Sequence, residues 1–460
     1  MTSPDTGETT AAVVPINSAR DTKQRRRQRE YWEKLYQEVF GGGGEALARV
    51  FAYARARKLA PIPLLLTVLQ RVCTSLPPGA TFEAGLGPGS MNLFTVLVGE
   101  SGSGKDTHIN AASEAAIVRV GDGAATRGPV ELGIGSGEGI VTALEPGEDG
   151  SRPVLFMETE AGNLAALFKR KGSTLRPTLL KMYSGGALGA TNKNDTTTVP
   201  RLSYTAGLVL GCQPDKAGVL LGGEDDGFKH RFVWTEMIDP LIKEDGLQAA
   251  LFGSAAPDEP RPVDVFLPDD VMHGKPLRVA REIEEVVVAE QENKRAYGVS
   301  SEGQGHSTQT RIKLSCALAL LHGQMKASMD DWRRAGVLMS YSRAVYGRAQ
   351  KHLESQEVDR RVKERRTEEA TRNRLEAERR NDVWEKLCHA IEGDGAVPRS
   401  DFRTNRLQND QRGVFDQLLK EGLESRLLKT RRDGRGPELL MPGERWGERD
   451  TIMSPVPGSE

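Results

Sequence analysis

The 460-residue chain has few cysteines, few aromatic residues and no long apolar run. Its four cysteines, Cys73, Cys212, Cys316 and Cys388, are far apart and form no CxxC pair, which argues against a disulfide framework and a structural zinc site. No stretch approaches the length of a membrane span, and the N-terminus lacks the apolar core of a signal peptide. We therefore expect a reduced, cytoplasmic protein without membrane contact.

An excess of charge of one sign is also missing, because 63 Lys and Arg residues face 64 Asp and Glu residues. Without a field over the whole molecule, any preference for nucleic acid must come from local patches. One such patch runs from Lys23 to Arg29, just before Tyr31 and Trp32 at helical spacing. We interpret it first as the solvated face of a basic helix, with a nucleic-acid-binding arm as the alternative.

Short apolar runs between residues 85 and 237 are typical of buried parallel strands. They are Phe94 to Val98, Pro153 to Met157, Ala206 to Leu210 and Phe232 to Thr235. Helical stretches separate the first three runs, and this alternation predicts an α/β fold with a mostly parallel sheet. The predicted divisions are 1–44 (a disordered tail to about residue 20, then a basic helix), 45–240 (the α/β core), 241–350 (a helical region), 351–381 (a charged helical spacer), 382–446 (a C-terminal module) and 447–460 (a disordered tail).

Within the helical region we expect helices over residues 277–297 and 310–353. Before them, residues 240–268 are rich in proline and acidic residues and read as a linker.

The most specific motif follows the first apolar run. It consists of Gly99, Glu100, Ser101, Gly102, Ser103, Gly104 and Lys105. This GxxxxGK pattern, with a strand before it and a helix after it, is typical of a phosphate-binding loop (P-loop). The glycines let backbone N–H groups turn toward a phosphate, while Lys105 and the helix N-terminus add positive charge. The pattern predicts an ATP site, and the alternative is a tight glycine turn that binds no nucleotide.

The residue after the lysine departs from the pattern. A Ser or Thr hydroxyl normally ligates Mg²⁺ at this position, and here the residue is Asp106. Asp106 could hold the metal through a water, or Thr107 could replace it in a shifted register. The extra negative charge should weaken nucleotide binding unless a metal neutralises it, so the motif supports ATP binding more strongly than hydrolysis.

Polar residues follow two of the other apolar runs. Glu158 and Glu160 come after the second run, where a P-loop ATPase needs carboxylates. We assign Glu160 to water activation and Glu158 to the metal, with an ordinary solvated turn as the alternative. Gln213 follows the third run and could sense the γ-phosphate, or it could simply cap a loop before Pro214.

The segment from Gly227 to Trp234 alternates polar and apolar residues, which predicts a half-buried strand. Lys229 and Arg231 would then project from the same face. Two cations on one face could reach the γ-phosphate of a neighbouring subunit as an arginine finger. The alternative is a surface strand that happens to be basic.

Several motifs fall in an order that resembles a known family. They are GESGSGK at 99–105, GSGEG at 135–139, ETE at 158–160, GSTL at 172–175, GFKHRF at 227–232, LSCALALLHG at 314–323 and DDWRRAG at 330–336. Together they resemble the RecA-like ATPase (helicase) portion of actinobacterial and phage replication proteins, including the C-terminal part of bifunctional primase–polymerases. The resemblance covers roughly residues 50 to 350.

The resemblance implies a RecA-like, ring-forming homo-oligomer, such as a hexamer, that uses ATP and Mg²⁺. It would act with other replication proteins on DNA, which the ring would hold as a single strand. Carried over by position, Lys105 would bind phosphate, Glu160 would activate water, and Arg231 would be the finger acting in trans. The first 90 residues lack paired metal-binding aspartates, so we do not expect primer synthesis.

The C-terminal module reads as three short amphipathic helices and a hairpin. The helices are expected at Asp382–Glu392, Arg399–Leu407 and Gln411–Glu421, and the hairpin turns at Gly434. This order resembles a winged helix, which can bind duplex DNA or a protein partner. The positive face for DNA would comprise Arg403, Arg406, Arg412, Lys429, Arg431, Arg432 and Arg435.

We therefore expect a DNA-dependent ATPase of a phage or mobile-element replication system, a helicase or helicase-like motor with ATP bound between subunits. The alternative is an ATP-controlled, DNA-binding initiator that switches assembly without motor activity, which Asp106 keeps open. A small-molecule kinase fits poorly, because it has little use for the spacer and the winged helix.

Overall fold

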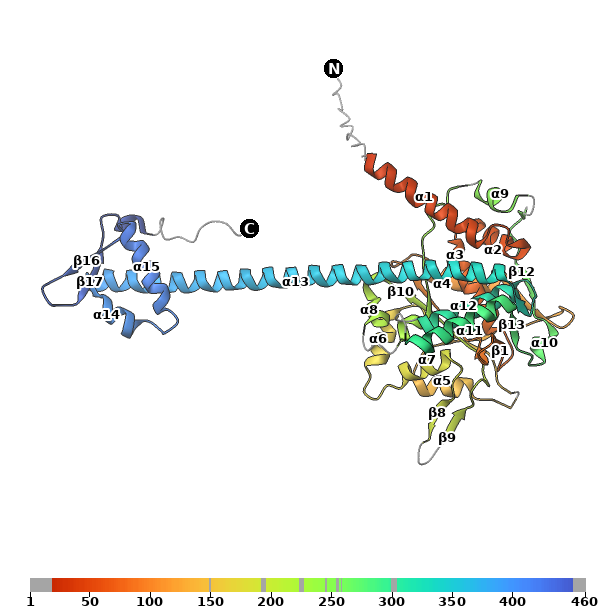
Figure 1. The fold of residues 1–460 in the computed structure, drawn as a ribbon. Coiled ribbons are helices and arrows are strands. Elements are labelled where there is room, and N and C mark those ends of the chain that lie inside the picture. Colours follow the sequence, from red (N-terminus) through yellow and green to blue (C-terminus); the bar gives the residue numbers. More distant parts are fainter. Residues whose placement is uncertain are drawn as a thin grey trace, which may run out of the picture. The chain divides into compact units, whose positions relative to one another are not determined.

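The computed structural model describes residues 19–148, 150–191, 196–222, 227–244, 246–253, 256–257, 259–298 and 304–449. The chain divides into two compact units, residues 1–354 and 355–460, which are described in turn (Figure 1). Residues 1–18 and 450–460, most of the two segments predicted to be disordered, lie outside the described ranges. Inside those ranges no helix combines the length and apolarity that crossing a membrane requires.

The first unit is built on a parallel sheet of five strands. In spatial order these are β11 (Phe232–Glu236), β3 (Phe94–Val98), β10 (Ala206–Cys212), β7 (Val154–Glu158) and β6 (Val130–Gly133). Every neighbouring pair is parallel. The four apolar runs of the sequence are therefore strands of one sheet, and the predicted α/β class is confirmed. Strands β3 and β10 bury all their side chains, as strands covered on both faces do.

Helices cover the two faces of this sheet. On one face, α3 (Pro61–Thr74) lies beside α4 (Lys105–Ala115), and the α3 residue Gln70 donates hydrogen bonds to the carbonyls of Leu93 (3.0 Å) and Leu208 (2.6 Å). On the other face, α7 (Leu175–Tyr183) packs its Tyr183 ring against Phe94, with 5.4 Å between ring centroids. The sheet is thus the middle layer of three, and its core is continuous with that of the covering helices.

The first residues of α13 (Met329–Asp394) satisfy the free edge of β11. The backbone N–H of Trp234 donates to the Ser342 hydroxyl (2.7 Å), and that of Glu236 donates to the Tyr341 hydroxyl (3.2 Å). Edge strands expose unpaired backbone donors, so two helix hydroxyls here replace a missing strand.

Smaller elements surround the core of the first unit. The helices are α1 (Ala19–Val39), α2 (Gly44–Ala56), α5 (Gly137–Leu144), α6 (Ala161–Lys169), α8 (Gly218–Leu221), α9 (Leu247–Phe252), α10 (Asp269–Met272), α11 (Arg281–Tyr297) and α12 (Gln304–Leu321), with the 3₁₀ turns η1 (Pro214–Lys216) and η2 (Phe228–Arg231). The strands are β1 (Thr81–Glu83), β2 (Pro88–Ser90), β4 (Ala116–Val120), β5 (Ala125–Thr126), β8 (Leu188–Thr191), β9 (Thr196–Val199), β12 (Val263–Phe266), β13 (Leu277–Val279) and β14 (Lys326–Ala327).

Three predictions for residues 240–353 need correction. The predicted linker contains β12, which pairs in parallel with β4 and buries Val263 and Val265. The predicted helix over 277–297 begins only at Arg281, because Leu277–Val279 pairs with β1 and β14. The predicted helix over 310–353 is two helices, α12 and α13, separated by β14. In each case a strand partner distant in sequence overrides the local pattern.

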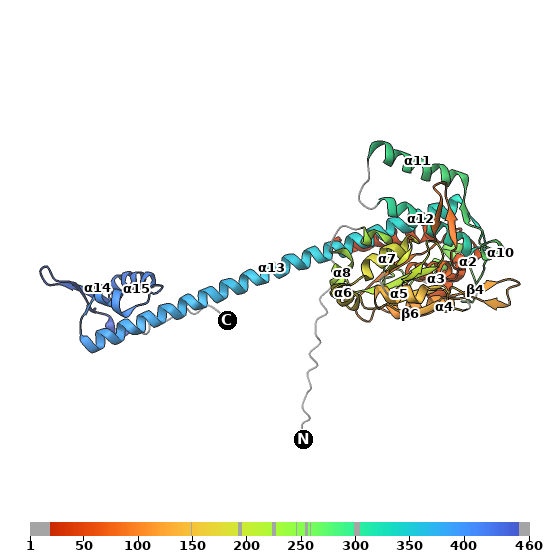
Figure 2. The same ribbon diagram turned by 90° about the horizontal axis from the view of Figure 1, so that it is seen from below.

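Helix α11 stands at the rim of the first unit (Figure 2). Its fully buried residues are Ile283 and Val287, and Tyr297 near its end is 75% exposed.

The second unit has its own core. It contains the C-terminal part of α13, then β15 (Val397–Pro398), α14 (Arg399–Asp401), the π-helical turn η4 (Phe402–Arg406), α15 (Arg412–Glu424), β16 (Leu428–Arg432), β17 (Glu438–Pro442) and η5 (Trp446–Glu448). The three strands form an antiparallel sheet in the order β15-β17-β16. Leu387, Phe402, Phe415 and Leu440 bring the helices and the sheet together in one buried cluster. The predicted hairpin is present, and the predicted second helix is the short α14 continued by η4.

Candidate functional site

A glycine-rich turn joins the buried strand β3 to helix α4. The turn spans residues 99–104 and its first amide, that of Gly99, donates to the carbonyl of Cys212 in β10 (2.9 Å). A Cβ atom on Gly99 would lie 2.4 Å from the Ser103 hydroxyl, so only glycine fits there. Gly104 caps α4 with φ of 79°, a left-handed conformation that other residues adopt with strain. The loop geometry therefore depends on glycine at both ends.

The Lys105 side chain folds back over this loop. Its ammonium group donates to the carbonyls of Gly99 (2.9 Å) and Glu100 (2.8 Å) and lies 3.5 Å from the Ser103 hydroxyl. The side chain is half-buried, so its charge is held at the mouth of the loop. A positive charge at this place, next to the free N–H groups of the first turn of α4, favours an anion.

The two candidates for metal binding, Asp106 and Thr107, are exposed in the first turn of α4. Both offer oxygen, which is the donor that Mg²⁺ prefers. Among the described residues no group of three His, Cys, Asp or Glu side chains forms a ready-made metal cluster. The choice between Asp106 and Thr107 therefore stays open.

The neighbouring strand ends lie at the same edge of the sheet as the loop. Cys212 of β10 pairs in register with Val98 of β3, and Leu210 pairs with Glu158 of β7. Because adjacent strands are about 4.8 Å apart, Glu158 and the start of the loop are separated laterally by about 10 Å, with Gln213 between them. Three of the predicted site regions thus meet at the carboxyl ends of parallel strands, where ligands of open α/β sheets bind.

The two glutamates at the carboxyl end of β7 differ in their surroundings. The Glu158 carboxylate accepts the backbone N–H of Glu160 (2.9 Å) and the amide of Asn163 (3.3 Å), which holds it over the first turn of α6. Glu160 is exposed, and no described residue forms a hydrogen bond or ion pair with its carboxylate. Glu158 is therefore positioned by its own helix, whereas Glu160 is free to meet a ligand or water.

Gln213 is half-buried and immediately precedes η1. Its backbone carbonyl accepts the N–H of Lys216 (2.9 Å), so the residue also caps this turn. Both interpretations of Gln213, the phosphate sensor and the cap, are compatible with this position.

The predicted strand over residues 227–234 is wrong in its first half. Phe228–Arg231 forms the 3₁₀ turn η2, and β11 begins at Phe232. The ladder starts there because Phe232 pairs with Phe94, the first residue of β3, so earlier residues have no strand beside them. In a 3₁₀ turn, residues two apart do not share a face, and the same-face argument for Lys229 and Arg231 no longer holds.

Arg231 itself is half-buried at the amino end of β11. Its guanidinium lies over the Tyr183 ring, 5.9 Å from the centroid, and His306 lies nearby. The loop of Lys105 is at the carboxyl end of β3, which is parallel to β11. The structure therefore places Arg231 and Lys105 of one chain at opposite ends of the parallel strands.

His108 is a site residue that the sequence analysis missed. It is buried in α4, and its Nε2 accepts the N–H of Ala60 at the start of α3 (3.0 Å). Its Nδ1 lies 2.8 Å from the Gly104 carbonyl and must therefore carry the proton. Burial lowers the pKa of His108, which keeps the ring neutral. This ring ties the end of the loop to α3, and a single histidine inside a helix gives no sequence signal of such a role.

We expect the stability of the chain to fall on acidification from pH 6.5 toward pH 4. Burial lowers the pKa of His108, and lowers that of His306 to about 4. The ordinary histidine pKa is about 6.5. At a pH between this value and the lowered pKa of the folded state, the unfolded chain binds protons that the folded chain does not, so acid favours unfolding. Urea unfolding followed by tryptophan fluorescence at pH 7.5, 5.5 and 4.5 measures the effect.

Carboxylates also titrate near pH 4, so the histidine contribution needs a variant. His306→Gln should flatten the dependence between pH 6.5 and 5 relative to the parent. A free energy of unfolding that rises on acidification over this range would contradict the assignment.

A second missed residue is Glu138, beyond the carboxyl end of β6. It is exposed in the first turn of α5, and its carboxylate accepts the hydroxyl of Thr174 (2.6 Å). That hydrogen bond is the main reason why the pKa of Glu138 is lowered. Gly137 contacts Thr174 so closely that a Cβ atom would lie 2.3 Å from its hydroxyl. The GSGEG and GSTL motifs thus form one structure that holds a third carboxylate near this edge.

No family model matches the chain, and a search of curated proteins finds no match either. What the site does must therefore be inferred from its own geometry.

Proposed function

We propose that the chain is a P-loop ATPase with a RecA-like core that acts on DNA as an oligomer in a phage or mobile-element replication system. One observation carries this proposal. The buried strand β3 leads into a glycine loop, and the Lys105 side chain is folded over that loop. Glu158 and Glu160 lie at the carboxyl end of β7, which is two strands away from β3 in the sheet.

The loop supports the binding of a triphosphate. The Lys105 ammonium group lies on the loop, and the loop leads directly into the N-terminus of α4, a combination that favours phosphate oxygens. The carbonyls that now accept from Lys105 are weaker partners than a charged phosphate, so a nucleotide would compete for the ammonium group.

The carboxylates support hydrolysis. Glu160, exposed and free of ion pairs with described residues, would accept a proton from the attacking water. Glu158, with either Asp106 or Thr107, would hold Mg²⁺, because these oxygen donors and the open position suit an ion that keeps several waters. When bound, the ion would neutralise charge on the phosphate oxygens. Gln213, between the loop and Glu158, would hydrogen-bond the water or the phosphate.

The position of Arg231 supports a site shared between subunits. A five-residue strand is about 16 Å long, so Arg231 and Lys105 of one chain are at least that far apart along the sheet. Arg231 would therefore serve the nucleotide of a neighbouring copy and stabilise the transition-state charge there. This arrangement needs a head-to-tail homo-oligomer, for which a ring such as a hexamer is the closed form.

The second unit supports contact with duplex DNA. Its order of helix, strand, two helical segments and hairpin agrees with the order expected of a winged helix and supports that proposal. Part of the expected positive face is neutralised, because Arg403 pairs with Asp416, Arg406 with Asp394 and Arg431 with Asp433. Lys429, Arg432 and Arg435 are exposed, and none forms an ion pair with a described residue, so the hairpin is where phosphates would bind.

We expect the triple variant Lys429→Ala, Arg432→Ala, Arg435→Ala to bind duplex DNA about tenfold or more weakly at low salt. Each lost phosphate contact should also reduce the slope of log K against log salt by about 0.9. Titration of a labelled duplex at several salt concentrations measures both. Lys420→Ala, an exposed lysine of α15, is the control and should bind as the parent does. Unchanged affinity in the triple variant would favour a protein partner for this module.

The competing function is an ATP-controlled switch, and Asp106 favours it because its carboxylate opposes phosphate charge. The turnover of ATP by the full chain with and without single-stranded DNA separates the two. Strong stimulation supports a motor, whereas tight ATP binding without turnover supports the switch. Failure to bind ATP at all would contradict both.

A further inference from the structure

A groove of about 1020 Å³ runs between α1 and the first turns of α13, away from the phosphate loop. Its α1 wall includes Tyr31, Lys34 and Leu35, and its α13 wall includes Trp332 and Arg343. All these residues belong to the first unit. The groove is not used by the function proposed above, and it adjoins the basic run of α1 that the sequence left unassigned.

The groove face of α1 carries a stripe of cations with one aromatic ring. Lys23, Arg27, Tyr31 and Lys34 are spaced by four, four and three residues, so they lie along one side of the helix. Tyr31 is 44% exposed, which is high for a tyrosine beside a hydrophobic core. Two acidic residues of this helix pair with cations outside the stripe, Glu30 with Arg26 and Glu33 with Arg29, whereas Glu38 lies 3.8 Å from the stripe residue Lys34 at the exposed surface. The stripe is therefore positive over about 16 Å of helix.

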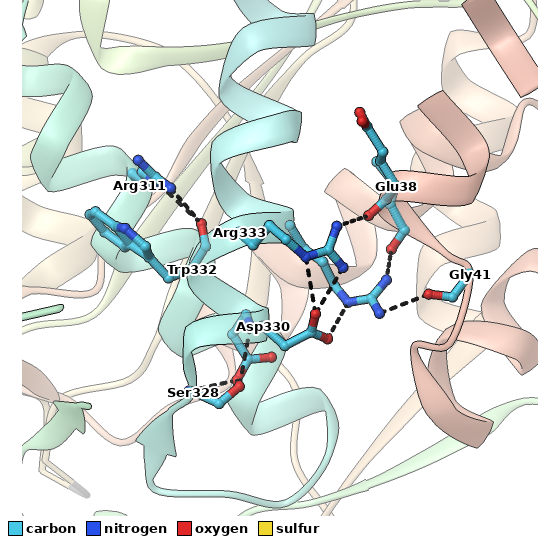
Figure 3. A network of polar contacts seen from close by, with 10 residues as sticks. Glu38, Gly41, Arg311, Ser328, Asp330, Trp332 and Arg333 are labelled. Atoms are coloured by element: carbon cyan, nitrogen blue, oxygen red, sulfur yellow. Dashed lines mark hydrogen bonds and ion pairs between the residues drawn. The ribbon is translucent and has the colours of Figure 1, made fainter. Parts of the chain in front are cut away.

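Two further arginines face the groove from α12 and α13. The Arg311 guanidinium stacks on the Trp332 ring at 3.8 Å and donates twice to the Trp332 carbonyl (3.1 and 2.9 Å), as Figure 3 shows. Burial lowers the pKa of Arg311, while the charge of Glu290 raises it and the charge of Arg343 lowers it. Within the described part of the chain, no carboxylate lies within 4.0 Å of the charged nitrogens of Arg311 or Arg343. Two arginines that line one groove and form no ion pair within this distance favour an anionic ligand.

Two acidic residues line the groove, Glu38, whose carboxylate pairs with Lys34, and Asp330. Asp330 accepts from Arg333 and Arg334, and these arginines also donate to the last carbonyls of α1, including that of Glu38 (3.3 Å; Figure 3). Arg334 bonds the carbonyls of Val39 (2.5 Å) and Gly41 (2.9 Å) in the same way. This end of the groove therefore fastens α1 to α13, as a C-terminal cap does. The groove wall formed by Tyr31 and Lys34 is the part that continues into the stripe.

We propose that the groove and the α1 stripe bind single-stranded nucleic acid, with phosphates on Lys23, Arg27, Lys34 and Arg343 and a base stacked on Tyr31. The inference rests on the proposed action on DNA and names a surface for it. Stacking on an aromatic ring beside a basic track is how single strands are held without sequence preference.

An acidic peptide is the other polyanion that a basic groove could take. The cations of α1 continue beyond the groove at regular steps of about 6 Å, one for every four residues. Evenly spaced charges along a straight line suit a chain of phosphates. The exposed tyrosine in the middle of that line offers a flat face to a base, which an acidic peptide would not use.

The test uses the full chain and fluorescence anisotropy with labelled (dT)₁₂ and an abasic 12-mer. Arg343→Glu should weaken binding of both oligonucleotides at least about tenfold and reduce the salt slope by about 0.7 or more. Tyr31→Ala should weaken (dT)₁₂ about tenfold and leave the abasic strand unchanged. Arg295→Glu on α11, an exposed arginine outside the groove, is the charge-matched control and should match the parent.

Three results would overturn the proposal. Equal losses for Arg343→Glu and Arg295→Glu would mean that only net charge matters. Equal effects of Tyr31→Ala on the two oligonucleotides would exclude stacking. Displacement of (dT)₁₂ by poly-glutamate at equal charge concentration, together with no effect of Tyr31→Ala, would assign the groove to an acidic protein. ATP binding is measured on the same variants, so that loss of the ATPase proposal and loss of this one are told apart.

Discussion

Replacing Lys105 by alanine is expected to weaken ATP binding about 100-fold or more and to remove hydrolysis. The ammonium group is held at the mouth of the loop by the carbonyls of Gly99 and Glu100, where it would exchange them for phosphate oxygens. Each hydrogen bond between charged partners contributes about 1.5–3 kcal/mol, and two such bonds account for the expected loss. Calorimetric titration with ATP and Mg²⁺ measures it.

The control for this prediction is Lys169→Ala, which removes the same charge from the exposed end of α6. It should bind ATP as the parent does. Thermal melting of both variants shows whether the loss of loop contacts has unfolded the chain. If a folded Lys105→Ala protein bound ATP with parental affinity, the loop would not be the phosphate site, and both the motor and the switch would be wrong.

Arg231→Ala is expected to keep ATP binding and to lose DNA-stimulated turnover by about 10³-fold, the lower range for a finger that stabilises transition-state charge. The ground state would be unaffected because Arg231 is at the amino end of β11, distant from the loop of its own chain. Steady-state phosphate release with and without single-stranded DNA, beside ATP titration, separates the two effects. Lys229→Ala tests whether the neighbouring lysine contributes.

The trans arrangement has a sharper test in mixed oligomers. Neither Lys105→Ala nor Arg231→Ala alone should hydrolyse ATP. A mixture should recover part of the activity, because some interfaces then combine Lys105 of one subunit with Arg231 of the next. Activity of Arg231→Ala alone at the parental rate, or no recovery in a mixture that is shown to co-assemble, would contradict the finger assignment.

Local patterns were sufficient for several parts of the fold. The runs at 94–98, 153–157, 206–210 and 232–235 are strands within two residues of their predicted ends. Each run is short and mostly apolar, and a polar residue or a glycine follows it, so its burial does not depend on which strand lies beside it. The loop before Lys105 is equally local, because glycine at 99 and 104 meets steric demands of the turn itself.

The secondary-structure predictions that were wrong share one cause. Leu277–Val279 became a strand because β1 and β14 lie beside it, and residues 228–231 became a 3₁₀ turn because no strand does. Neither partner is visible in a window of neighbouring residues. The sequence analysis missed the roles of His108 and Glu138 for the same reason. Their hydrogen-bond partners, Ala60 and Thr174, are 48 and 36 residues away in the sequence.

The sequence alone therefore determined the class of the fold, the position of the glycine loop and the polar residues at the strand ends, because these depend on nearest neighbours along the chain. Only the tertiary structure decided which strands lie side by side, so that their polar ends come together. It also decided that Arg231 and Lys105 are at opposite ends of the strands, and that α1 and α13 enclose a basic groove. Strand order and helix packing are set by contacts between segments that are distant in sequence, and no single stretch of residues specifies those contacts.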